Sequence, residues 1–200
     1  SLEAIGREKA GVMRMGKPVV FGAHWMPASI REYSNKLGAE LFQRGNEFDV
    51  LEQNADWRWC GLSASGERLI IDKLPIPKLE LDNAATALQA LQLMPEAIKV
   101  EAVANGIARA RLSGRGQKLQ WRNEAGLLIN VILDVSHNPQ AVKRLTALLE
   151  KDPCVGKTYA ILAMCKDKDY DRVIGLLEPQ VQSWTATTFD SSRALTAREL

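Results

Sequence analysis

The sequence predicts an α/β fold with parallel strands and a small antiparallel β portion, and three observations support this prediction. Residues 17–43 and 118–187 alternate apolar, strand-like runs with helix-like segments, which favours the parallel sheet of a nucleotide-binding fold. Residues 48–77 alternate apolar and polar side chains without helical spacing, which predicts short antiparallel strands. The apolar run at 131–133 turns polar at Asp134, as a strand does where it ends at a ligand site.

Helices and strands alternate through the first 112 residues. In chain order, the predicted elements are a helix at 5–12, a strand at 17–22, a helix at 27–37, a strand at 39–43, strands at 56–62 and 68–72, and helices at 84–91 and 95–110. Trp57 and Trp59 point to the same face of their strand, which favours core packing over base stacking. Asp82 or Asn83 fits the cap of the helix at 84–91.

Residues 113–117 contain two glycines and are predicted to form a flexible joint between two domains. Beyond it we expect strands at 118–121 and 127–134, a helix at 139–150, a strand at 158–164, a helix at 170–177, a strand at 181–187 and the start of a helix at 196–200. This β-α-β-α-β order predicts a Rossmann-like unit.

The turn that follows residues 131–133 is where the sequence predicts chemistry. The apolar run itself is expected to be a strand buried on both faces. Asn138 fits the cap of the next helix and Pro139 fits its first position. At the carboxyl end of such a strand, Asp134 can accept hydrogen bonds from ribose hydroxyls and His137 can face an anionic substrate. The alternative for His137 is a packed histidine that orients the turn.

Composition excludes several classes of protein. The formal charge is +2 and the chain has no basic run, which argues against a nucleic-acid partner but leaves small anions open. Three cysteines without a CxxC pair indicate neither a disulfide framework nor a zinc site, and a cytoplasmic setting is expected. No apolar run approaches the roughly 20 residues that span a bilayer, so no membrane partner is expected. Residues 156–158 are not a phosphate-binding loop, because Lys151 stands where that motif needs glycine.

Five motifs occur in one order along essentially the whole chain, and together they resemble the dihydrofolate synthase/folylpolyglutamate synthase family, whose relatives include the Mur cell-wall ligases. The motifs are Ile5–Gly11 (IGREKAG), Asp82–Leu88 (DNAATAL), Gly114-Arg115, Asp134–Pro139 (DVSHNP) and Ala163–Asp169 (AMCKDKD). Members of the family use ATP and Mg²⁺ to join L-glutamate to dihydropteroate or to a reduced folate. ATP phosphorylates the acceptor carboxylate, and the glutamate amine then attacks the acyl phosphate and releases ADP and phosphate.

The resemblance also implies an organisation for the chain. Residues 1–112 would be the C-terminal part of a P-loop-type ATPase domain, and residues 118–200 the N-terminal part of a Rossmann-like ligase C-terminal domain. The family's phosphate-binding loop, pterin-contacting segments and most Mg²⁺ ligands would lie upstream of Ser1. The chain is therefore expected to be an interior piece that does not turn over by itself, and the intact protein is expected to be a monomer.

Particular residues acquire roles through the same resemblance. Lys9 matches a lysine that is carbamylated, a change that needs a neutral amine and that replaces a cation with anionic oxygens for Mg²⁺. Asn83 matches a residue that contacts adenine, and Asp134 matches a carboxylate near the ribose. Arg115 matches an interdomain arginine that reaches the ATP phosphates, where it can balance charge that develops during phosphoryl transfer. His137 and Lys168 lie in motifs that face the cleft and have supporting roles.

Some of these residues also have ordinary structural explanations, and the sequence is consistent with other functions. The Glu8-Lys9 pair alone is typical of a solvated ion pair, and Asn83 alone is typical of a helix cap. Ser113 replaces the usual proline of the family's Pro-Gly-Arg motif, which loosens the joint but keeps the arginine. The alternative functions are a Mur-type ligase acting on a UDP-muramoyl substrate and a non-catalytic adenine-nucleotide-binding module. The amino acids of the motif at residues 6–11 favour the folate branch of the family over a Mur-type ligase.

Overall fold

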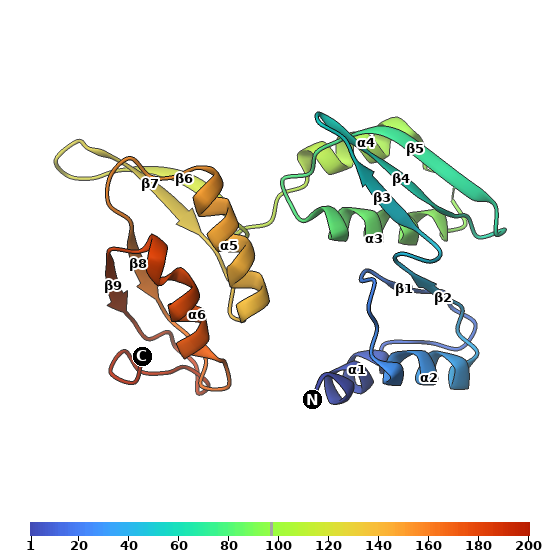
Figure 1. The fold of residues 1–200 in the computed structure, drawn as a ribbon, viewed down its shortest axis with the longest axis horizontal. Helices are drawn as coiled ribbons and strands as arrows, with labels where there is room; N and C mark the ends of the chain where they lie inside the picture. The colour runs from blue at the N-terminus through green and yellow to red at the C-terminus, as the bar shows by residue number, and fades with distance from the viewer. Residues whose placement is uncertain (97) are drawn as a thin grey trace. The chain divides into compact units, whose positions relative to one another are not determined.

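The computed structural model describes residues 1–96 and 98–200 and has a mixed α/β fold, as predicted. The chain divides into two compact units, Ser1–Arg111 and Leu112–Leu200 (Figure 1). Among the described residues, none of the helices has the length and apolar character that crossing a membrane requires.

The first unit opens with a β-α-β motif. Helix α1 (Leu2–Ala10) is followed by strand β1 (Val19–Phe21), helix α2 (Ala28–Leu37) and strand β2 (Leu41–Gln43). β1 and β2 are parallel, with Val20 opposite Phe42, which confirms the predicted parallel pairing. Gly38 ends α2 with a φ of 64°, a left-handed conformation that suits glycine.

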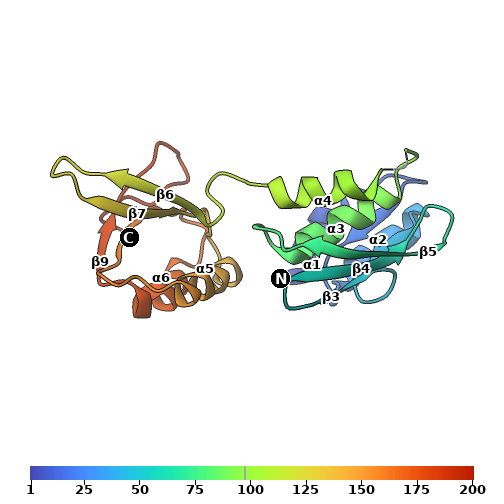
Figure 2. The ribbon, with the colours of Figure 1, turned by 90° about the horizontal axis from the view of Figure 1, so that it is seen from above.

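An antiparallel sheet with strand order β3-β4-β5 completes this unit, as the alternation at 48–77 predicted. Its strands are β3 (Asp49–Glu52), β4 (Asp56–Leu62) and β5 (Arg68–Pro75), and the helices that follow are α3 (Leu81–Gln92) and α4 (Val100–Arg109). Trp57 and Trp59 are fully buried and pack in one cluster with Leu88 of α3 and Val103 of α4. Both helices therefore lie against one face of the sheet (Figure 2), and core packing of the two tryptophans is confirmed.

The predicted start of α4 at Pro95 is wrong, because the helix begins at Val100. Residues 94–96 form a bend, and position 97 of the predicted helix lies outside the described residues. Ile98 lines the pocket between α3 and α4, and Lys99 is the cap of α4, so neither residue belongs to the helix.

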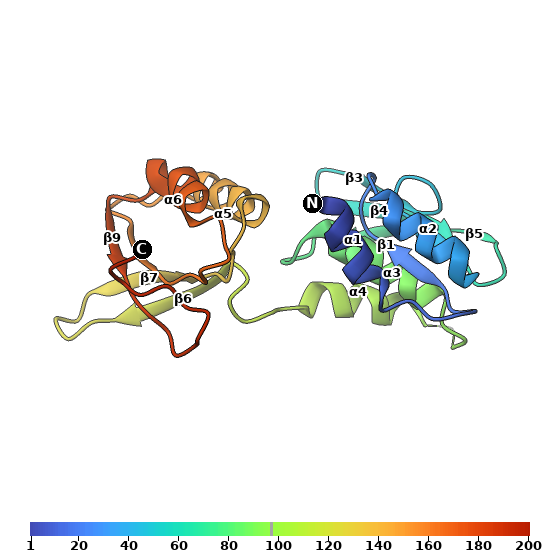
Figure 3. The ribbon, with the colours of Figure 1, turned by 90° about the horizontal axis from the view of Figure 1, so that it is seen from below.

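The second unit begins with a hairpin of β6 (Gln117–Arg122) and β7 (Leu128–Leu133). Helix α5 (Pro139–Lys151), strand β8 (Tyr159–Leu162), helix α6 (Tyr170–Leu177), a 3₁₀ turn (Glu178–Gln180) and strand β9 (Ser183–Ala186) follow. β8 and β9 are parallel, and α5 and α6 lie side by side (Figure 3). Val142, Met164 and Val173 form the centre of the core of this unit.

Two predictions for this unit are wrong. β7 is not buried on both faces: its residues are exposed or half-buried, and among the described residues none of them joins the core cluster around Val142 and Val173. Residues 196–199 form a turn and not a regular helix. That turn is closed by the Glu199 carboxylate, which accepts hydrogen bonds from the backbone N–H of Thr196 at 2.8 Å and from its hydroxyl at 2.9 Å.

Candidate functional site

Lys9 lies near the end of α1 on its exposed side. Its Nζ is 3.1 Å from Oε1 of Glu8, and the two side chains are 69% and 73% exposed. α1 itself is firmly attached, because the Glu3 carboxylate accepts hydrogen bonds from the backbone N–H groups of Ala28 and Ser29 at 3.1 and 2.9 Å. The lysine is therefore an accessible amine on a fixed helix.

Gly6 explains why the Ile5–Gly11 motif contains a glycine inside a helix. A Cβ at this position would lie 2.7 Å from Ser29 Oγ and 2.9 Å from Cβ of Pro27. α1 and α2 can pack this closely only when position 6 has no side chain. The glycine of the motif therefore allows α1 to pack closely against the start of α2, and this packing holds the helix that carries Lys9.

Asn83 lies inside α3 and is not its cap, contrary to the capping prediction. The cap position is Glu80, so Asp82 and Asn83 are the second and third residues of the helix. The helix starts earlier than predicted because Leu81 already packs against the buried cluster around Trp57 and Trp59. The Asn83 side chain is exposed, and helix capping does not explain why an asparagine stands at this position.

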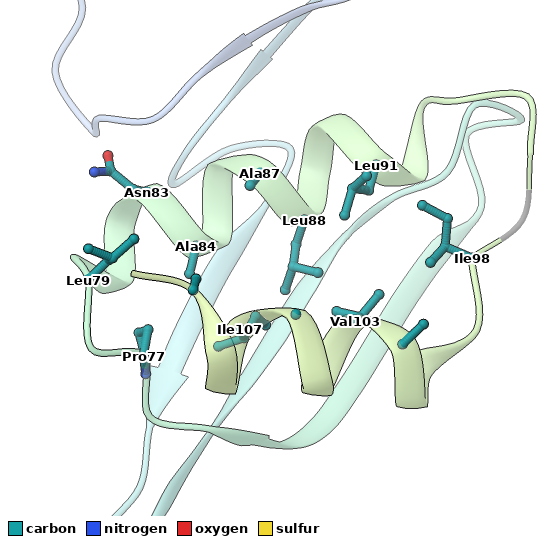
Figure 4. A pocket seen from close by; sticks show the side chains of 13 residues that line it. Pro77, Leu79, Asn83, Ala84, Ala87, Leu88, Leu91, Ile98, Val103 and Ile107 are labelled. Carbon is teal, nitrogen blue, oxygen red and sulfur yellow. The ribbon is translucent and has the colours of Figure 1, made fainter. Parts of the chain in front are cut away.

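A pocket of about 300 Å³ lies between α3 and α4, next to Asn83. Its walls are apolar and come from Pro77 and Leu79 and from Leu88, Val103 and Ile107 of the two helices. Asn83 stands at one end of the pocket, and its amide points away from the apolar side chains (Figure 4). The amide is therefore directed outside the apolar recess, where it can meet the polar edge of a ligand that lies over this end of α3.

A cluster that the sequence did not predict lies at the carboxyl end of β2. The Arg44 side chain is 11% exposed, its Nε is 3.1 Å from Oδ1 of Asp49, and its Nη1 pairs with Oδ1 of Asp82. Burial would lower the pKa of the Arg44 guanidinium, but the hydrogen bonds to Asp82 and Asp49 outweigh it and raise the pKa. His24 lies at the edge of the cluster, with its Nε2 3.9 Å from Asp49. The signal in the sequence that could have predicted this cluster is a basic residue directly after a parallel strand.

Arg115 and Asp134 meet at one turn of the second unit. Gly114 and Gly116 have φ values of 69° and 57°, so the chain reverses around Arg115 as only glycines readily allow. The Asp134 carboxylate accepts a hydrogen bond from the backbone N–H of Gly116 at 2.7 Å and another from that of Ser136 at 2.7 Å. Asp134 therefore holds the turn that carries Arg115.

The Arg115 guanidinium is exposed, and within residues 1–96 and 98–200 it has no hydrogen-bond or ion-pair partner. Val135 N–H donates to the Gly114 carbonyl at 2.8 Å, which binds the two strands together on either side of the turn. The backbone is thus fixed while the cation is available to an anionic ligand.

His137 is exposed, so the alternative of a packed histidine does not describe it. Its Nδ1 lies 3.1 Å from the Val135 carbonyl oxygen, and because a carbonyl can only accept, Nδ1 carries the proton. Nε2 is left for a ligand. Asn138 caps α5 through a 2.9 Å hydrogen bond from the backbone N–H of Ala141, and Pro139 is the first helical residue, as predicted.

Lys168 lies in the loop after β8, where it pairs with Asp167 at 2.8 Å. Arg193, from the loop after β9, donates to both oxygens of Asp167 at 3.0 Å. The carboxylate therefore ties together the two loops at the carboxyl ends of the parallel strands. Lys168 and Arg193 also lower the pKa of Asp167 from 3.8 to about 2.

This contact predicts a pH dependence. Since the pKa of Asp167 is lowered in the folded protein, its contribution to stability is present above about pH 4 and is lost as the pH falls toward 2. A titration of the Asp167 carboxyl carbon by NMR should give a midpoint near 2. In the Arg193→Gln variant the midpoint should rise, but not fully to the ordinary value, because Lys168 remains. An unchanged midpoint would contradict the contact.

Three of the predicted site residues are close together, and three are not part of that group. Arg115, Asp134 and His137 surround the turn between the joint and α5. Lys168 lies in another loop of the same unit, whereas Lys9 and Asn83 belong to the first unit. Among the described residues, no group of three or more His, Cys, Asp or Glu side chains is arranged to hold a metal ion.

Residues 114–200, which include this turn, match the family described as the Mur ligase, glutamate ligase domain. Relatives that match the whole chain are more specific. The chain is 34% identical over 198 residues to the dihydrofolate synthase/folylpolyglutamate synthase of Escherichia coli strain K12, covering 99% of this chain and 44% of the relative. It is 32% identical over 213 residues to the enzyme of the same name from Haemophilus influenzae, covering 99% and 47%. The resemblance to this family is thereby confirmed.

Solved structures agree with these relatives. A structure of E. coli FolC in complex with DHPP and ADP matches with a TM-score of 0.82 and 35% identity, over 98% of this chain and 45% of that one. A bifunctional folylpolyglutamate synthase/dihydrofolate synthase with Mn, AMPPNP and L-glutamate bound matches with a TM-score of 0.84 and 36% identity, over 99% and 45%. The chain thus spans less than half the length of the relatives that it matches.

Proposed function

We propose that these residues are part of an ATP-dependent ligase that joins L-glutamate to dihydropteroate, to folate (poly)glutamates, or to both. The observation that carries the proposal is the turn at Arg115, where Asp134 fixes the backbone and leaves the guanidinium available within a glutamate ligase domain. The similarity to synthases of this name over 99% of the chain supports the choice of substrates. The relatives solved with nucleotide, Mn and L-glutamate support ATP and a divalent metal.

In this proposal the acceptor carboxylate is first phosphorylated by ATP. The amine of L-glutamate then attacks the carbonyl carbon of the acyl phosphate, the new C–N bond forms, and the C–O bond to phosphate breaks. Arg115 lies against the phosphates and stabilises the negative charge that spreads over the transferring group. His137 presents Nε2, which can accept a proton from the glutamate nitrogen as the C–N bond forms.

Lys9 is the residue proposed to hold Mg²⁺, through a carbamate on its amine. Carbon dioxide can reach the exposed amine, and a carbamate offers oxygen ligands to a hard cation, but the amine is paired with Glu8 at 3.1 Å, a contact that favours the ammonium and that carbamylation would have to replace. Mg²⁺ commonly takes one or two carboxylate-type ligands from the protein and the rest from phosphates and water. When bound, the ion would neutralise charge on the transferring phosphoryl group.

The remaining assignments follow the same proposal. Asn83 contacts the adenine edge, Asp134 lies near the ribose, and Lys168 contributes to the nucleotide side of the site. Residues 1–112 form the end of the ATPase domain, 113–117 the joint, and 118–200 the start of the ligase C-terminal domain. The intact protein acts as a monomer in the cytoplasm, with neither nucleic acid nor membrane as a partner. These 200 residues contain no phosphate-binding loop and would not turn over alone.

The test is ADP formation by the full-length ligase that contains these residues. With ATP, Mg²⁺ and L-glutamate present, we expect ADP release that depends on dihydropteroate or on tetrahydrofolate. Release with a UDP-muramoyl acceptor only would move the protein to the Mur branch. Adenine-nucleotide binding without release for any acceptor would make it a binding module and would overturn the ligase proposal.

A further inference from the structure

We infer that Arg44 is a positioning residue for nucleotide recognition: it fixes the first turn of α3, and thereby Asn83, against the carboxyl ends of β1 and β2. The inference rests on the proposed function, in which Asn83 contacts adenine. Arg44 itself would not touch the nucleotide. Its effect would pass through Asp82, the residue that directly precedes Asn83.

The position of Arg44 is set by its own backbone. It follows β2 directly, and its N–H donates to the Phe21 carbonyl of β1 at 2.9 Å. The neighbouring Gln43 is 5% exposed and donates from its side-chain amide to the His24 carbonyl at 2.6 Å. Gly45 then reverses the chain with a φ of 87°. The backbone that carries the Arg44 side chain is therefore held in place.

The guanidinium reaches two elements that are far apart in the sequence. It contacts Asp49, the first residue of β3, and Asp82, the second residue of α3. The planar fork of arginine can serve both carboxylates at once, which a lysine ammonium does less well. The Arg44 side chain is 11% exposed, whereas Asp49 and Asp82 are 40% and 48% exposed, so the guanidinium is shielded from water while its two partners stay partly open to solvent.

The first turn of α3 has further contacts that leave it little freedom. The Thr86 hydroxyl donates to the Asp82 carbonyl at 2.6 Å. A Cβ at Gly22 would lie 2.2 Å from Thr86 Oγ1, so the residue after β1 touches α3 at Thr86 with no side chain between them. Arg44 supplies the charged contact in this set, and its loss would release the Asp82 side chain from β2.

The experiment compares ATP with ITP as substrates of the full-length ligase. Asparagine reads adenine through its N6 amino group and N7, and the 6-oxo group of ITP changes that edge. Arg44→Met should raise the KM for ATP about tenfold, since a hydrogen-bonded charged contact is lost, with a smaller change in kcat. The KM for ITP should change much less, so the preference for ATP should fall. Arg44→Lys should lie between Arg44→Met and the unmodified protein.

Matched variants separate positioning from a structural role. Arg58→Met removes another arginine of the same unit, which pairs with Asp72 across β4 and β5, and should leave the ATP preference unchanged. If Arg44→Met and Arg44→Lys reduce activity with ATP and ITP equally, Arg44 is only structural and the inference is overturned. Asn83→Ala tests the underlying function: an unchanged ATP preference in that variant would remove the adenine contact itself.

Discussion

Replacing Arg115 by alanine should reduce acceptor-dependent ADP formation by the full-length ligase about 10³-fold, which is the order expected when an arginine that stabilises a transferring phosphoryl group is lost. The structure gives the physical reason. Gly114 and Gly116 form the turn, Asp134 holds it, and the guanidinium has no partner within residues 1–96 and 98–200. Its removal therefore costs no internal contact, and the fold should stay intact. The measurement is steady-state ADP release, with circular dichroism to check folding.

Arg122→Ala is the matched control for this prediction. Arg122 ends β6 and donates to the Gly126 carbonyl at 2.7 Å, at the opposite end of the strand from Arg115. At about 3.3 Å per residue, the two positions are separated by roughly 20 Å along the chain. The control should keep the activity of the unmodified protein. Equal losses in both variants would show that the effect is not specific to the turn.

Local rules explain why the region around Asp134 could be predicted from sequence. An apolar β-branched run, an asparagine and a proline in sequence favour a strand, a cap and a first helical position, and the structure has β7, the Asn138 cap and Pro139 at the start of α5. These preferences depend on residues within one or two turns of each other. The parallel pairing of β1 with β2 and of β8 with β9 followed from similarly local alternation.

Contacts between distant segments could not be predicted in the same way. The cap prediction for Asn83 was wrong because Leu81 packs in a core formed by residues of other elements, among them Trp57 and Trp59 of β4. The sequence did not predict the cluster around Arg44, because its partners, Asp49 and Asp82, lie on two other elements. The burial expected for β7 assumed apolar layers on both faces of its sheet, and among the described residues none of its side chains joins the core cluster around Val142 and Val173. The resemblance to the family named site residues, but the contacts that each of these residues makes became known only from the structure.

Asp134 shows most clearly how the structure refines an expectation from sequence, and it gives the second large prediction. The sequence suggested a carboxylate that accepts hydrogen bonds from ribose hydroxyls. In the structure both oxygens accept from backbone N–H groups, those of Gly116 and Ser136, each at 2.7 Å. Asp134→Ala removes both acceptors and frees the turn, so kcat should fall roughly 10- to 100-fold, the equivalent of one hydrogen bond to a charged group. Asp134→Asn keeps one acceptor and should lose less.

Comparison of ATP with 2′-deoxy-ATP distinguishes the two roles of Asp134. If the carboxylate acts by holding the Arg115 turn, Asp134→Ala lowers kcat for both nucleotides and leaves their ratio of kcat/KM unchanged. If it binds the ribose, the variant loses the preference for ATP and the ratio approaches one. Asp152→Ala is the matched control, since Asp152 is an exposed carboxylate that pairs with Lys118 Nζ at 2.5 Å and, within residues 1–96 and 98–200, has no hydrogen bond or ion pair with residues 114–116. Because Arg115 is presented by a backbone that Asp134 fixes, the double variant with Arg115→Ala should be no slower than Arg115→Ala alone.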